Sequence, residues 1–293
     1  MSFEKFKPSS EEIKKAEGMM TERESGLSEV REKEINVEKI KEEIEKFRET
    51  ISDKFDAENA AKINSALDLM VDLHSTQEER PDHRPYISHP LEIADDVVNK
   101  YEVKKPELVL AALLHDSVED QSLKLSVKRL ERQYGTIGNE AEIKNPEFLK
   151  EKFHEELEEI ALGEIGFQYG DRVREVVEKL SNPDFDSLIE ELKLKGVEKS
   201  KNELYKEHVA EAIEDPDVCV IKYADFARNA LKLGSIPEGL KKDKLRKKYG
   251  PVIQEVFLPV FRSLEGAHPL FGKREEIIKE LEAVYKKEYE GKY

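Results

Sequence analysis

The amino-acid sequence predicts an all-α protein, a helical bundle with an amino-terminal helical arm and carboxy-terminal helices. Glycine and proline are sparse, with 14 and 12 residues among 293, and the helix formers Glu, Lys, Leu and Ala dominate. Apolar residues recur at steps of three and four in several segments, as they do on one face of a helix. The longest apolar run, residues 108–114, has the length of a core helix and is too short for a membrane span.

Net charge and cysteine content indicate which kinds of binding partner and which cellular compartment to expect. The net charge is −16, which repels nucleic acid and anionic lipid, so we expect no nucleic-acid partner and no membrane partner. A small anionic substrate needs a locally basic pocket or a bound metal to overcome the same repulsion. The opening residues MSFEKFKPSSEEIKK have no apolar signal-peptide core, and the single cysteine, Cys219, lies in the apolar stretch VCVI. We therefore expect a cytoplasmic protein in which Cys219 is a core residue.

The first element is a charged helical arm that we assign to residues 1–52, ahead of a main domain at 53–293. Its apolar stripe lies on a helix otherwise made of Glu and Lys, and consists of Val37, Ile40, Ile44, Phe47 and Ile51. The stripe can dock onto the main domain. It can also pair with a second copy as a coiled coil and form a homodimer, although two heptads are few for that purpose.

The main domain opens with a helix predicted at 57–74, followed by the polar loop HSTQEERPDHRPYISHP. Pro90 suits the first turn of the next helix, LEIADDVVNKY. The segment ELVLAALLHDSVED predicts a buried helix, because its length and its alanines and leucines disfavour a strand. From 121 to 170 the chain is polar and interrupted by glycines, so we expect short irregular helices and an insertion at about 136–165.

The remainder of the chain returns to amphipathic helices. DRVREVVEKL and DPDVCVIKYADFARNALKL are each predicted as one helix, although the β-branched first half of the second could also form a strand. An apolar face repeats over 253–264, and a charged terminal helix carries Ile277, Leu281 and Val284. The basic run KKDKLRKK at 241–248 is either a solvated helix face or the flank of an anionic ligand.

The strongest chemical signal is a cluster at the end of the apolar segment. His115, Asp116, Glu119 and Asp120 occupy positions i, i+1, i+4 and i+5, which on one helix span about 140° of its surface. Unpaired carboxylates placed so closely repel one another and are costly to desolvate. A bound cation is the simplest reason for this arrangement. The alternative is a helix end that has simply reached solvent.

Two further residues could complete a metal site. His89 lies in YISHP, and Asp225 lies on an apolar helix face with Asn229 one turn later. A buried aspartate of this kind is usually bound to a cap, an arginine or a metal. Together with His115 and Asp116 they offer two imidazoles and two carboxylates, a set that suits Mn²⁺, Fe²⁺ or Zn²⁺ and contains no thiolate.

The order of four motifs, RPYISHP, LLHDSVEDQ, YGDRVREVVEKLSN and KYADFARNALKL, resembles the HD superfamily of metal phosphohydrolases. More closely, it is similar to the hydrolase domain of RelA/SpoT homologues, which removes the 3′-pyrophosphate of the alarmones ppGpp and pppGpp. The similarity covers roughly residues 57–265. It implies an HD-domain helical bundle and a small anionic nucleotide as substrate. About 30 residues follow the matched region, too few for the synthetase domain of the large members, so the resemblance implies a small alarmone hydrolase.

The resemblance also implies a role for each matching residue. His89, His115, Asp116 and Asp225 fall on the metal ligands, and manganese is the family's usual ion. Glu119 and Asp120 fall on the acidic pair that orients and activates the attacking water. The remaining matches concern the substrate. Arg80 falls on the arginine that clamps the phosphates, and Arg84 with His83 could add positive charge there. Tyr86 would pack the loop, and Asn229 falls on the asparagine that contacts the nucleotide.

Several positions depart from the family pattern and leave other functions open. Gln121 stands where threonine is usual, and Tyr223, Phe226 and Arg228 replace leucine, arginine and histidine. The same metal site could act on another phosphorylated nucleotide or metabolite, such as NADPH or a nucleoside phosphate. A third hypothesis is a nucleotide sensor without catalysis, which would give Glu119 no physical task.

Overall fold

The structure is a computed structural model that describes residues 31, 34–80, 83–134 and 156–292. Every regular element in these ranges is a helix and none is a strand, so the predicted all-α class is confirmed. Residues 1–30 of the arm, and residues 135–155 with much of the expected insertion, lie outside the described residues.

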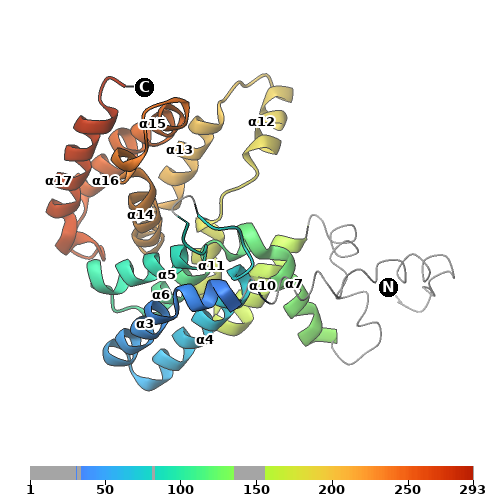
Figure 1. Ribbon diagram of the computed structural model, residues 1–293. Helices are drawn as coiled ribbons and strands as arrows, with labels where there is room; N and C mark the ends of the chain where they lie inside the picture. The colour runs from blue at the N-terminus through green and yellow to red at the C-terminus, as the bar shows by residue number, and fades with distance from the viewer. Residues whose placement is uncertain (1–30, 32–33, 81–82, 135–155, 293) are drawn as a thin grey trace.

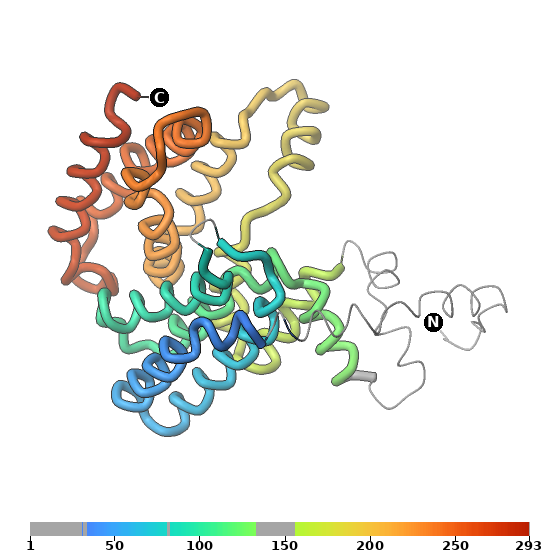
Figure 2. Tube along the Cα trace, viewed as in Figure 1, coloured from blue at the N-terminus to red at the C-terminus, as the bar shows by residue number. Residues whose placement is uncertain are grey.

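The helices form two groups joined by α14 (Pro216–Ala230), as Figure 1 shows. The first group consists of α3 (Lys41–Lys54), α4 (Ala57–His74), α5 (Ser88–Asp95), α6 (Pro106–Leu114), α7 (Ser117–Tyr134), α10 (Leu157–Tyr169) and α11 (Asp171–Leu180). The second consists of α12 (Phe185–Leu194), α13 (Lys201–Ala212), α15 (Leu240–Val252), α16 (Leu258–Ser263) and α17 (Arg274–Val284). Short π-helical or 3₁₀ turns cover Asp96–Lys100, Leu233–Ser235, Ile253–Phe257, Phe271–Lys273 and Tyr285–Tyr289. The colour order in Figure 2 shows that the chain completes the first group before the second.

The centre of the first group is α6, which is apolar on every side. Residues 108–114 are each at most 1% exposed, and the helix packs against α4, α5, α11 and α14. A helix that is apolar all round is stable only when other elements surround it. The buried helix predicted for this run is therefore confirmed, and it gathers helices that are distant in sequence.

Capping residues set where two important helices begin. α4 has the bounds predicted from its periodicity, and the Asp56 carboxylate accepts a hydrogen bond from the backbone N–H of Asn59. α14 begins at Pro216, and the Asp215 carboxylate accepts from the backbone N–H groups two and three residues on. These local signals favour the helix over the strand, and the single helix predicted here is confirmed. Cys219 is buried within it.

The apolar stripe of the arm docks onto the body of the protein. Ile40, Ile44, Phe47 and Ile51 are at most 5% exposed and belong to the same hydrophobic core as α4 and α6. α3 packs directly on α4. The stripe is thus covered by the protein's own residues, and α3 is part of the domain's core.

The continuous helix predicted for ELVLAALLHDSVED is wrong at its end. α6 ends at Leu114, His115 and Asp116 form a turn, and α7 starts at Ser117. The break has a packing reason, because α6 is surrounded on all sides whereas α7 buries one side against α4 and α10. Glu119 and Asp120 consequently lie in the first turn of a separate helix.

The described parts of the region from 121 to 170, residues 121–134 and 156–170, are mostly helical. α7 has a kink at Gln121, where the backbone is not helical (φ −132°, ψ 22°), and then runs to residue 134. α10 covers 157–169 and packs against α7 and α11. Gly163 and Gly166 lie inside α10 without ending it. At Gly166 an added Cβ would lie 3.2 Å from Cδ of Arg174, so glycine permits the close approach of α11. Tertiary packing here outweighs the low helix propensity of glycine.

The basic run at 241–248 is helical, but its residues have different surroundings. Lys242 and Arg246 are 4% and 5% exposed and form ion pairs with Glu238 and Glu288. A solvated face is therefore wrong for these two residues. Lys248 instead lines the cavity described below.

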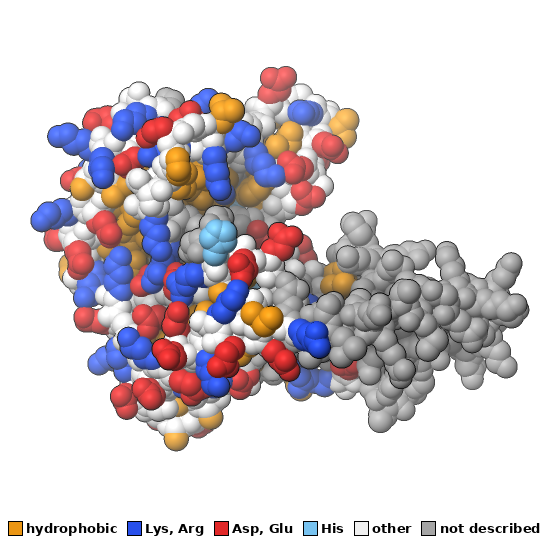
Figure 3. Space-filling view, in the orientation of Figure 1, with side chains coloured by type: hydrophobic (Ala, Val, Ile, Leu, Met, Phe, Trp, Pro, Cys, Tyr) orange, Lys and Arg blue, Asp and Glu red, His pale blue; other side chains and the backbone are white. Residues whose placement is uncertain are grey.

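The described surface is rich in charge. Charged side chains of both signs cover most of the face in Figure 3, and hydrophobic side chains occur there in small groups. No helix in the described ranges has the length and apolarity that crossing a membrane requires.

Candidate metal centre

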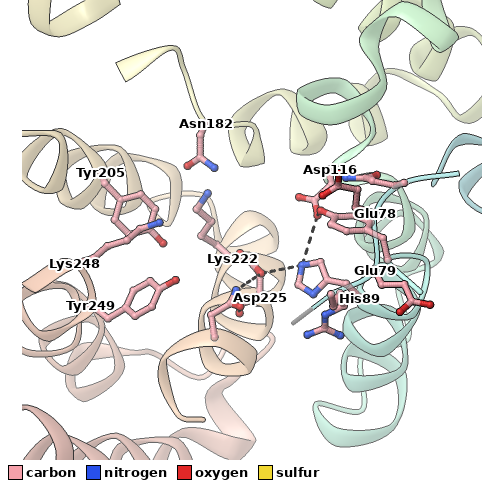
Figure 4. A pocket seen from close by; sticks show the side chains of 14 residues that line it. Glu78, Glu79, His89, Asp116, Asn182, Tyr205, Lys222, Asp225, Lys248 and Tyr249 are labelled. Carbon is pink, nitrogen blue, oxygen red and sulfur yellow. Dashed lines mark hydrogen bonds and ion pairs between the residues drawn. The ribbon is translucent and has the colours of Figure 1, made fainter. Parts of the chain in front are cut away.

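Two histidines and two aspartates from three places in the chain meet at one point. His89 lies at the start of α5, His115 and Asp116 form the turn after α6, and Asp225 lies in α14. His89 Nε2 is 3.3 Å from Asp225 Oδ1 and 3.5 Å from Asp116 Oδ2, as the dashed lines in Figure 4 show. His115 Nε2 is 3.0 Å from Asp116 Oδ1. Ligand atoms of His89, His115 and Asp225 lie within 4.8 Å of one another, close enough for one ion to contact all three.

Ion pairs hold α14 against α5 so that these side chains meet. Arg228 of α14 contacts Asp96 at 2.6 Å and Glu92 at 2.9 Å. Burial opposes ionisation of Glu92, but the charges of Arg228, Arg84 and Arg80 lower its pKa below the usual value. The carboxylate is therefore charged, and it joins Arg80 and Arg84, which precede α5, to α14.

The departures from the family pattern within α14 point away from the site. Tyr223 and Phe226 are at most 1% exposed and pack with Phe257, and Tyr223 also contacts Phe261. Arg228 is occupied by its ion pairs with α5 and the following turn. These three replacements therefore adapt the core and the helix contact.

The hydrogen bonding of His115 prepares it for a metal. Its Nδ1 lies 2.9 Å from the backbone oxygen of Ala112, which can only accept, so Nδ1 carries the proton. Nε2 then lies 3.0 Å from Asp116 Oδ1 and is the ring nitrogen left for a cation to bind. It is buried and has no hydrogen-bond partner among the described residues. Metal-bound histidines commonly have this arrangement, in which a backbone carbonyl fixes the tautomer. The residues present thus fit a divalent cation.

The charges of the cluster reinforce one another. Burial works against ionisation of Asp116, yet the neighbouring charge of His115 holds the pKa of that carboxyl far below its usual range. Burial likewise opposes the charged form of His115, but Asp116 raises its pKa to about 9, and a cation bound at Nε2 would displace that proton. The Tyr86 hydroxyl donates to Asp116 Oδ2 at 2.6 Å, and burial, followed by the charge of Asp116, raises the pKa of Tyr86. Asp116 is thus held as a carboxylate, the form that binds a cation.

The acidic pair of α7 lies just behind the cavity wall. Glu119 accepts hydrogen bonds from the backbone N–H and the side-chain amide of Asn182, both at 3.1 Å. Loss of water around part of the carboxyl raises the pKa of Glu119. Asp120 accepts from the Gln77 side-chain amide at 2.9 Å. Asn182 and Gln77 line the cavity, whereas Glu119 and Asp120 are not among its lining residues.

The cluster of candidate metal ligands opens into a cavity of about 660 Å³. This volume is in the range of sites for small-molecule ligands. One wall is formed by the consecutive residues 77–80, which include Glu78 and Glu79. Figure 4 shows Tyr205, Lys248 and Tyr249 on the side opposite His89 and Asp116, with Lys222 and Asn182 between the two sides. The cavity therefore combines a carboxylate and imidazole end with a wall of lysines and tyrosines.

The structure places three of the four residues expected to bind substrate at the cavity and one away from it. Arg80, Tyr86 and Asn229 line the cavity. Arg80 lies 3.4 Å from a Glu92 oxygen, and the Asn229 amide donates to Asp225 Oδ1 at 2.9 Å. Arg84 is not among the lining residues, because it pairs with Glu43 and Glu92 on the outer side of the loop.

Several lining residues were not identified from the sequence. Lys222 is 4% exposed and its Nζ donates to the backbone oxygen of Leu180 at 2.9 Å. Its position one turn before Asp225 in an apolar segment was the available signal. Lys248 lies 4.2 Å from the centre of the Tyr205 ring. Tyr205 and Tyr249 reach the cavity from α13 and α15, and no local pattern marks them.

No protein-family model matches this chain, and a search of curated proteins finds no match.

Proposed function

We propose that this protein is a metal-dependent phosphohydrolase that acts on a small phosphorylated nucleotide. The observation that carries the proposal is the convergence of His89, His115, Asp116 and Asp225 at one end of a cavity that Lys222 and Lys248 also line. The donor set suits a borderline divalent ion. Lysine and arginine offer phosphate the positive surroundings that a protein of net charge −16 needs.

Within this class, the proposed substrates are the guanosine alarmones ppGpp and pppGpp. The protein would then be a guanosine-3′,5′-bis(diphosphate) 3′-pyrophosphohydrolase that releases pyrophosphate and GDP or GTP. Support comes from the resemblance of RPYISHP, LLHDSVED and KYADFARN to the hydrolase domain of RelA/SpoT homologues. A cavity of about 660 Å³ is also large enough for a nucleotide.

The four converging residues would hold the ion, which we propose to be manganese, with iron or zinc as alternatives. When bound, the ion supplies the charge that polarises a phosphoryl oxygen and lowers the pKa of water. Arg80 offers a two-pronged donor to the phosphate oxygens. Asn229, held by its bond to Asp225, faces the nucleotide.

In the proposed reaction a water oxygen bonds to the phosphorus attached to O3′, and the bond between that phosphorus and O3′ breaks. Glu119, one hydrogen bond behind the wall residue Asn182, accepts the proton that the attacking water loses through one intervening water, while Asp120 and Gln77 fix the neighbouring loop. O3′ takes up a proton as pyrophosphate leaves. Hydrolysis thus needs no reactant other than water.

The test is pyrophosphate release from ppGpp by the purified protein with Mn²⁺. We expect release that disappears in Asp116→Ala and in a chelated sample, and that persists in Asp53→Ala, an exposed aspartate outside the cavity. Inorganic phosphate from NADPH or a nucleoside phosphate, without turnover of ppGpp, would replace the alarmone with another substrate. Nucleotide binding without any turnover would support a sensor. A wild-type protein that binds no divalent ion contradicts the whole proposal.

A further inference from the structure

The segment 34–43 lies against the loop 75–80, which supplies one wall of the cavity. Residues 34–39 are helical, a turn follows at residue 40, and α3 then begins. Three side chains of this segment, at positions 36, 39 and 43, contact the loop region. Steps of three and four place side chains on one side of a helical segment. One side of the segment 34–43 is therefore directed at Ser75, Glu79 and Arg84.

The innermost of these contacts is buried. Asn36 is 4% exposed, and its side-chain amide donates to the backbone oxygen of Ser75 at 2.7 Å. Ser75 is fully buried and follows the last residue of α4. The last carbonyls of a helix have no partner within the helix and need one elsewhere. Asn36 thus fixes the point at which the loop leaves α4.

The outermost contact leads to the cavity arginine through a chain of charges. Glu43 Oε2 lies 2.5 Å from Arg84, which also pairs with Glu92. Glu92 in turn lies 3.4 Å from Arg80. In addition, the backbone N–H of Arg80 donates to the backbone oxygen of Arg84 at 2.9 Å. α3 is therefore connected to the one arginine that lines the cavity within the described residues.

The middle contact concerns the charge of the cavity wall. Glu78 and Glu79 both line the cavity, where their charge would repel a phosphate ligand. Lys39 forms an ion pair with Glu79. In Figure 4 the Glu79 carboxylate points away from the cluster around Asp225. Lys39 thus neutralises one of two adverse carboxylates and holds it outward.

We propose that segment 34–43 is a positioning element of the substrate site. Asn36 and Glu43 hold the 75–80 loop and Arg80 in place, and Lys39 neutralises Glu79 so that a phosphate ligand can enter. The identity of this ligand class rests on the proposed function. The three side chains contact no metal ligand, so their loss lowers phosphate affinity and leaves metal affinity intact.

Calorimetric titrations with Mn²⁺, and with inorganic pyrophosphate after Mn²⁺, test the charge effect on the full chain. In Lys39→Glu we expect pyrophosphate binding to weaken about fivefold, the upper range for an exposed ion pair, with unchanged Mn²⁺ binding. Lys39→Arg should bind like wild type. Lys46→Glu is the matched control, because it makes the same change of charge at an exposed position of α3. Equal weakening in Lys39→Glu and Lys46→Glu would overturn the role of Lys39.

Hydrogen exchange tests the positioning without any ligand. In Asn36→Ala the amides of 76–80 should exchange about tenfold faster, while those of 108–114 stay protected. Glu43→Ala, at an exposed position, is a second variant with the same expected direction. Unchanged exchange of 76–80 in both variants overturns the proposal, whatever the protein hydrolyses. Faster exchange in a protein that binds no pyrophosphate would instead count against the proposed function and leave the positioning standing.

Discussion

Glu119 stands at the first turn of α7, where Asn182 donates to it from both its backbone and its side chain. These bonds orient the carboxylate, and partial loss of water raises its pKa, which makes it a better proton acceptor. It lies outside the four converging residues. Glu119 can therefore be tested separately from metal binding.

We expect Glu119→Gln to lower kcat by about 10²- to 10⁴-fold, because an amide keeps the shape of the side chain but accepts no proton. Mn²⁺ affinity should stay at the wild-type value. The measurements are pyrophosphate release and calorimetric Mn²⁺ titration. An unchanged rate with metal still bound removes Glu119 from the proton transfer.

Lys222 is the second residue whose role can be isolated. Its Nζ is anchored to the Leu180 carbonyl and lines the cavity. In Lys222→Met the aliphatic stem remains while the charge is lost, so KM should rise about tenfold, the effect of one lost hydrogen bond to a charged group. Lys244→Met, at an exposed position of α15, is the control and should leave KM unchanged. An unchanged KM in Lys222→Met would limit this lysine to a structural tie between α14 and α11.

At the scale of the element, the start of α14 decides where Asp225 lies. Asp215 caps this helix and also binds Arg172 at 2.7 and 2.9 Å and Lys179 at 2.9 Å. The hydrogen bond from Arg172 is the main reason that the pKa of Asp215 lies below its usual range, although burial opposes it. These contacts join the start of α14 to α11.

The pH dependence of this contact has a definite sign. A carboxyl whose pKa is lower in the folded than in the unfolded protein stabilises the fold above the unfolded pKa and loses that contribution as the pH falls. We expect Asp215→Asn to lower the free energy of unfolding by about 1 kcal/mol at neutral pH, with the difference from wild type shrinking below about pH 4. Urea unfolding of both proteins at neutral pH and below about pH 4 measures this difference in the free energy of unfolding. A difference that persists undiminished in acid would contradict the ion-pair explanation.

At the scale of the whole molecule, the candidate metal centre connects α5, the turn after α6, and α14, which belong to distant parts of the chain. An ion that binds only the folded protein stabilises it by mass action, by about 2.7 kcal/mol at about 100 times its Kd. For a chain of this size that corresponds to a Tm increase of roughly 5 °C. We expect Mn²⁺ to raise the Tm of wild type and of Asp53→Asn, but not of Asp225→Asn. A wild-type Tm that does not respond to Mn²⁺ counts against the metal site.

Local chemistry explains which parts of the fold could be predicted. α4 was predicted with its observed bounds because its periodicity is encoded in consecutive residues, and the structure adds the Asp56 cap at its start. α6 was recognisable because a run of apolar residues has no stable place on a surface. The candidate metal ligands were also accessible to sequence reasoning, since histidines and aspartates in apolar surroundings are costly without a partner.

The incorrect predictions have a common physical origin in tertiary packing. The break at His115 and Asp116 reflects the different neighbours of α6 and α7, which the continuous apolar and acidic pattern does not reveal. Gly166 read as an interruption, yet its missing side chain allows α11 to approach α10. Lys242 and Arg246 read as solvated, yet Glu288 from the end of the chain covers them.

The sequence by itself determined the helical class, most helix positions and the residue types of a candidate cation site, because these depend on short-range periodicity and on the cost of burying charge. Only the tertiary structure decided the cavity's far wall, where Tyr205, Lys248 and Tyr249 arrive from α13 and α15. It also decided that Arg84 faces Glu43 while Arg80 faces the cavity. These features depend on which helices pack together, a property of contacts between residues distant in the chain that no local pattern specifies.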